Sequence, residues 1–123
     1  MKVKNIELFK NLSQYDFSGN YYDFHNDFMC TEILFNAETL IFTFKKIVKD
    51  FVVSIQFNDV SLVYSNFDLN KKIEPLTIDL IYRGRYEKNK KLIEFENNKG
   101  FIYTEFYEGQ KIEFWSSSVE LKE

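Results

Sequence analysis

The stretch that decides the fold reads Phe51-Val52-Val53-Ser54-Ile55-Gln56-Phe57. Every second side chain from Phe51 to Phe57 is apolar, a period typical of a strand with one face on a core. The same alternation recurs at Phe42 and Phe44, and again at Leu76, Ile78, Leu80 and Tyr82. Aromatic residues make up 19% of the chain, and many of them occupy these alternating positions. The sequence therefore predicts a small, mainly antiparallel β protein.

Length and composition indicate one domain over residues 1–123. Apolar residues form 45% of the chain, which is enough for a single core, and charged residues form an ordinary 28%. No uncharged apolar run is long enough to span a bilayer, and no apolar signal segment follows Lys4. The lone cysteine, Cys30, cannot form an internal disulfide. We therefore expect a cytoplasmic protein without a membrane span, unless a leader has been removed.

Turns in this chain depend on asparagine and aspartate, because it has only 4 glycines and 1 proline. The hairpin turns that we predict are Asn36-Ala37-Glu38, Lys49-Asp50, Asn58-Asp59, Asn97-Asn98-Lys99-Gly100 and Glu108-Gly109-Gln110. The strands that we predict between the breaks are 28–35, 39–48, 51–57, 60–66, 76–83, 91–96, 101–107 and 111–117. About eight such strands predict an antiparallel meander that forms a sandwich or an open barrel. Before them, Asn5 could cap a short helix with Ile6, Phe9 and Leu12 along one side.

The last turns fix a register for the C-terminal third. A loop over 97–100 places Glu96 opposite Phe101 and Glu94 opposite Tyr103, and a three-residue loop over 108–110 places Glu105 opposite Glu113. The same three-residue loop places Tyr107 opposite Lys111 and Tyr103 opposite Trp115. One face then collects the apolar set Ile93, Phe95, Ile102, Phe106, Ile112 and Phe114. The opposite face collects Glu94, Glu96, Phe101, Tyr103, Glu105, Tyr107, Lys111, Glu113 and Trp115.

This second face combines aromatic rings with carboxylates. In one interpretation another part of the chain, such as the N-terminal segment, half-covers the rings. In the other, the face binds a basic protein, because tyrosine and tryptophan are enriched at interface hot spots and carboxylates attract a positive surface. The candidate partner-binding residues are Glu94, Glu96, Phe101, Tyr103, Glu105, Tyr107, Glu113 and Trp115. A net charge of −3 with scattered lysines argues against nucleic acid as the partner.

The residues that could carry chemistry are few. Asp23, His25 and Asp27 could hold a metal or form an acid–base pair if their segment were extended. Transition-metal sites usually draw another histidine or cysteine, and Cys30 is the only such residue left. We therefore expect Asp23 and Asn26 to cap a turn, His25 to bond to the backbone, and Cys30 to be a buried hydrophobe. The sequence predicts neither an enzyme nor a bound cofactor.

The segment Tyr22-Asp23-Phe24-His25-Asn26-Asp27 precedes Glu32-Ile33-Leu34-Phe35 and Leu40-Ile41-Phe42-Thr43-Phe44. This arrangement resembles the opening of small bacterial all-β proteins that include immunity proteins of polymorphic toxin systems. The resemblance covers about the first third of the chain. It implies a cytoplasmic protein that binds and blocks a secreted toxin and has no catalysis of its own.

Three functional hypotheses follow from these observations. The first is a non-enzymatic protein-binding module, in the form of an immunity-type inhibitor of a basic toxin domain. The second is a lipocalin-like carrier that encloses a small apolar ligand within a curled sheet. The third is a metal-dependent enzyme that uses His25 with Asp23 and Asp27.

Overall fold

The computed structural model describes residues 2–4, 14–17 and 20–123, and this part of the chain contains strands and no helix. The first sheet has the order β1 (Lys2–Lys4), β14 (Ser118–Lys122), β6 (Val52–Asn58), β5 (Thr39–Lys46) and β4 (Phe28–Asn36). The second has the order β11 (Phe95–Glu96), β12 (Lys99–Phe106), β13 (Lys111–Ser116) and β7 (Ser61–Ser65), with β8 (Ile78–Arg83) also paired to β12. Two hairpins stand apart, β2 (Gln14–Phe17) with β3 (Asn20–Asp23) and β9 (Tyr86–Lys88) with β10 (Lys91–Ile93).

The mainly antiparallel β prediction is confirmed, and each predicted strand has a counterpart. The predicted strand 91–96 is divided into β10 and β11, while β1, β2, β3, β9 and β14 were not predicted. The predicted helix beginning near Asn5 lies outside the described residues. Among the residues that are described, no helix is long and apolar enough to cross a membrane.

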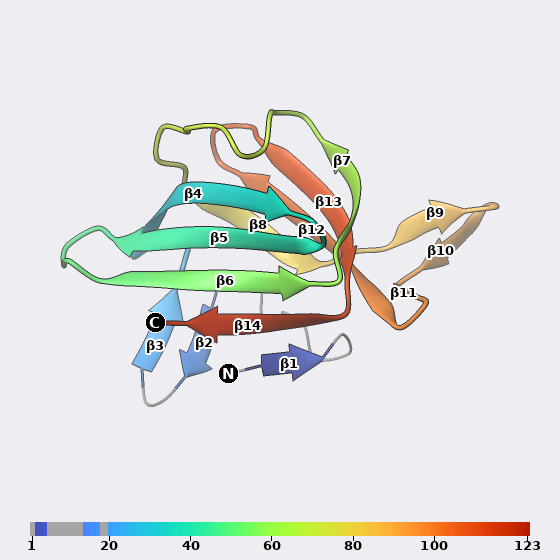
Figure 1. Cartoon of the computed structure of the whole chain (residues 1–123), viewed down its shortest axis with the longest axis horizontal. Coiled ribbons are helices and arrows are strands. Elements are labelled where there is room, and N and C mark those ends of the chain that lie inside the picture. The colour runs from blue at the N-terminus through green and yellow to red at the C-terminus, as the bar shows by residue number, and fades with distance from the viewer. Residues whose placement is uncertain (1, 5–13, 18–19) are drawn as a thin grey trace.

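The core lies between the two sheets, which pack as layers (Figure 1). Inward-facing rings meet across the layers: Phe42 lies 6.2 Å from Phe106, and Phe57 lies 4.8 Å from Phe114, between ring centroids. These are the apolar positions of the sequence alternation, and each ring is at most 1% exposed. Because side chains occupy this interior, the structure does not favour an enclosed apolar ligand.

One edge of the sandwich is a corner where two paired strands pass from one sheet to the other (Figure 1). Strand β6 continues into β7, β13 continues into β14, and Asn58 pairs with Ser118 on one side of the corner. On the other side Ser61 pairs with Trp115. The predicted hairpin turn at Asn58-Asp59 is therefore wrong, because β6 and β7 belong to different sheets. Asp59, with φ of 52°, turns the strand without reversing it.

The opposite edge is joined by backbone hydrogen bonds between β4 and the segment before β8. The Cys30 amide donates to the Leu76 carbonyl at 2.7 Å, and the Leu76 amide donates back at 2.9 Å. The two sheets are thus joined at both edges, by strands that continue through the corner and by this bridge, which makes the fold intermediate between the predicted sandwich and open barrel.

The connection over 66–75 covers one end of the core, against which Phe67, Leu69 and Ile73 pack. Asn70 anchors this connection to β4. Its side-chain amide donates to the Phe35 carbonyl at 2.7 Å, and its Oδ1 accepts the Phe35 amide. Asn70 has a φ of 64°, a left-handed conformation that asparagine tolerates better than most residues.

Replacing Asn70 separates these two contributions. Asn70→Gly removes the hydrogen bonds but keeps the backbone unstrained, and we expect it to lower the free energy of unfolding by about 1 kcal/mol. Asn70→Ala adds the cost of a left-handed alanine, roughly a further 1 kcal/mol. Urea denaturation of both variants measures the difference, and equal values would contradict the role of the left-handed backbone.

Candidate functional site

Strands β12 and β13 sort their faces as predicted, but their pairing is shifted by two residues. The prediction that Ile93 and Phe95 share the core face is wrong: both are half-buried, and Ile93 belongs to the separate β9–β10 hairpin. Tyr103 lies opposite Glu113 rather than Trp115, because the loop closes one residue earlier than expected, where the Phe106 amide donates to the Gln110 carbonyl at 2.9 Å. The turn before β12 is shorter than predicted: only Asn97 and Asn98, both with positive φ, separate the paired residues Glu96 and Lys99. A shift of two keeps every side chain on its original face, since the period of a strand is two.

This shift corrects the predicted like-charge pair. Glu105 lies opposite Lys111, not opposite Glu113, and the Lys111 Nζ is 3.8 Å from the Glu105 Oε1. The register thus replaces a repulsive cross-strand contact with an attractive one.

Phe101 and Trp115, two of the predicted binding rings, are covered. They are 2% and 8% exposed, and Tyr86 of β9 lies over both, at 5.5 Å and 5.9 Å between ring centroids. Gly84, two residues before Tyr86, lets the chain pass close to Phe101, because a Cβ there would lie 3.1 Å from the Phe101 ring. The interpretation in which another part of the chain covers the rings therefore holds for these two, with β9 as a covering segment.

Glu94 and Glu96, two of the predicted carboxylates, form ion pairs near the β9–β10 hairpin, which projects from the sandwich (Figure 1). The Arg85 Nε lies 3.3 Å from the Glu94 Oε1. Lys88 donates a hydrogen bond to Glu96, and that bond together with the negative charge raises the pKa of Lys88. These two carboxylates are therefore already occupied within the chain.

Three of the remaining predicted residues, Tyr103, Glu105 and Glu113, lie on what we term the outer face of the second sheet. The outer face consists of Tyr64, Leu80, Tyr103, Glu105, Lys111 and Glu113. Cross-strand pairing places Glu113 between Tyr64 and Tyr103, and places Glu105 between Leu80 and Lys111. Tyr107 stands beyond it in the loop and is 77% exposed. The sequence did not identify Tyr64, because no short turn ties β7 to its partner strand. The predicted alternation through Ile78 and Leu80 is wrong at Leu80: the β8–β12 register shifts between Ile78 and Leu80, so Leu80 faces outward and Ile81 is buried instead.

The two glutamates of the outer face differ in their partners within the chain. The Tyr103 hydroxyl donates to the Glu105 Oε2 at 2.9 Å, and Glu105 also lies near Lys111. Glu113 forms no ion pair with any residue that the structure describes. Tyr64 and Leu80 are 45% and 37% exposed. The outer face therefore presents an available carboxylate beside exposed aromatic and apolar groups.

The Asp23–Asp27 segment forms a turn, as predicted. The Asp23 carboxylate accepts hydrogen bonds from the Asn26 amide at 3.1 Å and from the Asn26 Nδ2 at 2.8 Å. Burial alone would raise the pKa of Asp23, but these bonds and the nearby His25 lower it below its ordinary value. His25 donates from Nδ1 to the Ile78 carbonyl at 2.6 Å. Within the described residues, no three histidine, cysteine or acidic side chains gather as a metal site.

Cys30 is a buried hydrophobe, as predicted, with its side chain 0% exposed. Burial raises the pKa of its thiol to about 12, although a contact with the Glu32 carbonyl partly opposes the shift. A thiol that stays protonated and covered is a poor nucleophile.

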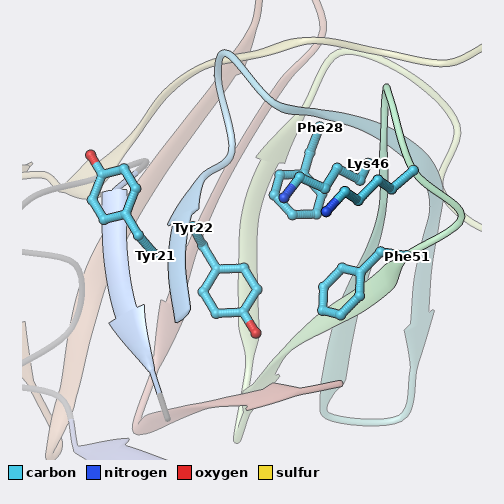
Figure 2. A pocket seen from close by; sticks show the side chains of 6 residues that line it. Tyr21, Tyr22, Phe28, Lys46 and Phe51 are labelled. Carbon is cyan, nitrogen blue, oxygen red and sulfur yellow. The ribbon is translucent and has the colours of Figure 1, made fainter. Parts of the chain in front are cut away.

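A cavity of about 180 Å³, which the sequence did not reveal, opens beside β3 (Figure 2). Its lining residues are Tyr21, Tyr22, Phe28, Lys46, Lys49 and Phe51. The Tyr22 ring lies 6.1 Å from Phe28 and 6.2 Å from Phe51, between centroids. The Lys46 Nζ lies 5.9 Å from the Phe28 centroid. The only sequence feature that pointed to this cavity was the group of lysines around the predicted Lys49-Asp50 turn. That feature did not indicate that β3 lies beside the turn.

Removing the ring over Trp115 should expose the only tryptophan in the chain. We expect Tyr86→Ala to shift Trp115 emission to longer wavelength and to increase its quenching by iodide, because the indole would meet water. Tyr107→Ala, which removes a ring already 77% exposed, is the control and should leave both signals unchanged. Identical spectra for Tyr86→Ala and the parent protein would contradict the covering role of β9.

Cys30 should resist alkylation in the folded protein. At pH 8 the thiol is far below its pKa of about 12, so iodoacetamide should react at the rate of unfolding. Mass spectrometry in increasing urea would follow the labelling. Rapid labelling without denaturant would contradict the burial.

The raised pKa of Cys30 also makes the free energy of unfolding depend on pH. Its stabilising contribution is fully present below pH 9.0 and should fall as the pH rises toward 12, because the unfolded state then loses the thiol proton while the folded state keeps it.

Comparison with protein-family models, curated proteins and solved structures finds no match to this chain.

Proposed function

We propose that this chain is a non-enzymatic protein-binding module that binds a basic protein through the outer face of its second sheet. The observation that carries the proposal is the cross-strand row Tyr64–Glu113–Tyr103, in which an available carboxylate lies between two tyrosines. Tyrosine contributes large rigid contact area at interface hot spots, and a carboxylate selects a partner that offers lysine or arginine.

A sheet face suits this role because its strands hold the contact residues rigidly. The outer-face residues belong to β7, β8, β12 and β13, which are hydrogen-bonded to one another in the second sheet. Their backbone is therefore already ordered, and binding a partner costs less conformational entropy. The exposed Leu80 and Tyr107 extend the contact area at the border of the face.

The narrower form of the proposal is an immunity-type inhibitor of a basic toxin domain. It rests on the resemblance of the segment from Tyr22 to Asp27 and the strands after it to such proteins. An inhibitor of this kind acts by covering its target and needs no reactive group of its own. The alternative enzyme is less well supported, because hydrogen bonds already engage His25 and Asp23 within the fold.

The test uses a secreted toxin domain encoded beside this gene, with affinity measured by calorimetry. We expect Tyr64→Ala and Glu113→Lys each to weaken binding by about tenfold or more, as hot-spot substitutions do. The control is Glu32→Lys, which reverses an exposed charge on β4 of the other sheet and should leave affinity unchanged. Circular dichroism melting would verify that all variants fold.

Two results would overturn the proposal. Unchanged affinity for both outer-face variants would show that the partner binds elsewhere. Equal weakening by Glu32→Lys would show that net charge, rather than the outer face, governs association.

A further inference from the structure

We propose that the cavity beside β3 binds a small molecule that combines one aromatic ring with one carboxylate. The site lies on the first sheet and its neighbouring hairpin, separate from the outer face of the second sheet. The inference therefore does not depend on the proposed protein-binding function.

The walls of the cavity fit an aromatic ring. The rings of Tyr22, Phe28 and Phe51 pack against one another, with centroids 6.1–6.4 Å apart, and together form one aromatic wall of the cavity (Figure 2). Tyr22 and Phe28 are buried in the core, which holds their rings in place, while Phe51 is half-buried at the rim. A volume of about 180 Å³ suits a single ring with a short substituent.

The charges of the cavity fit an anion. Lys46 and Lys49 both line it, and neither forms an ion pair with a described residue. The Lys46 ammonium lies over the Phe28 ring face, at 5.9 Å from its centroid, which keeps the charge beside the cavity. The neighbouring Lys45 instead pairs with Asp50 at 3.7 Å, so the closest acidic residue of the turn has another partner.

The hairpin geometry keeps both lysines at the same opening. The Lys46 amide donates to the Phe51 carbonyl at 2.8 Å, which closes the turn over residues 47–50. Strand β5 ends at Lys46, two residues before the end of the predicted strand at 48, so Lys49 can return toward the rings. Two ammonium groups above aromatic walls match a ligand whose carboxylate points outward and whose ring points inward.

The experiment is an NMR titration of the full chain with three matched probes. The probes are 3-phenylpropionate, its neutral amide 3-phenylpropanamide, and propionate, which lacks the ring. We expect saturable amide shifts at Phe28, Lys46 and Phe51 with 3-phenylpropionate in the millimolar range, and no shift at Glu113. The other two probes should bind at least about tenfold more weakly, because the amide lacks the negative charge and propionate lacks the ring.

Lysine variants then test which ammonium groups bind the carboxylate of the probe. Lys46→Gln and Lys49→Gln, separately and together, should weaken 3-phenylpropionate binding, the double variant by about tenfold or more. Lys45→Gln removes a lysine from the same strand whose side chain pairs with Asp50, and should leave binding unchanged.

Three outcomes would overturn the inference. They are the absence of saturable shifts, equal binding of the neutral amide, and unchanged affinity of the double lysine variant. The outer-face variant Glu113→Lys should bind 3-phenylpropionate normally, so failure of this site and failure of the protein-binding proposal can be told apart.

Discussion

Two paired strands keep one continuous register as they bend from the first sheet into the second, and the rest of the structure depends on this corner. The Asn58 carbonyl accepts both the Ser116 hydroxyl at 2.7 Å and the Ser117 amide at 3.1 Å. These bonds satisfy backbone groups that would otherwise lose their ladder partners at the bend. Because the register is continuous across the bend as far as the Leu62–Phe114 pair, Phe57 of one sheet and Phe114 of the other meet at 4.8 Å within the core.

The corner also determines which groups reach solvent. It directs β7 along β13, and a register shift between Phe114 and Glu113 then places Tyr64 beside Glu113 on the outer face. On the first sheet, the hairpin between β5 and β6 places Lys46 and Phe51 beside β3. The result is two surfaces of different character: a sheet face with tyrosines and carboxylates, and a smaller cavity with aromatic walls and lysines. We propose a protein partner for the first and a small anionic ligand for the second.

Much of the fold and part of the outer face could be predicted from the sequence. The alternation of apolar residues identified the strands of both sheets, and the parity of positions from Phe101 to Trp115 identified the side opposite the core. The pairing itself was wrong by two residues, because a slip of two moves no side chain to the other face and leaves the hydrophobic pattern unchanged. The turn at Asn58-Asp59 was mistaken for a hairpin, since a left-handed Asp59 serves a bend between sheets as well as a reversal.

The sequence by itself determined that this chain is an antiparallel β protein, which residues of β5, β6, β12 and β13 face its core, and that Asp23 and Asn26 form a turn. These properties depend on neighbours in the chain or on a period of two, and both are visible in the order of residues. Only the tertiary structure decided that Tyr86 covers Trp115 and that Arg85 and Lys88 form ion pairs with Glu94 and Glu96. It also decided that two lysines line the same cavity as the rings of β3 and β4. Those contacts join strands and hairpins whose relative placement is set by packing across the whole core, which no local pattern encodes.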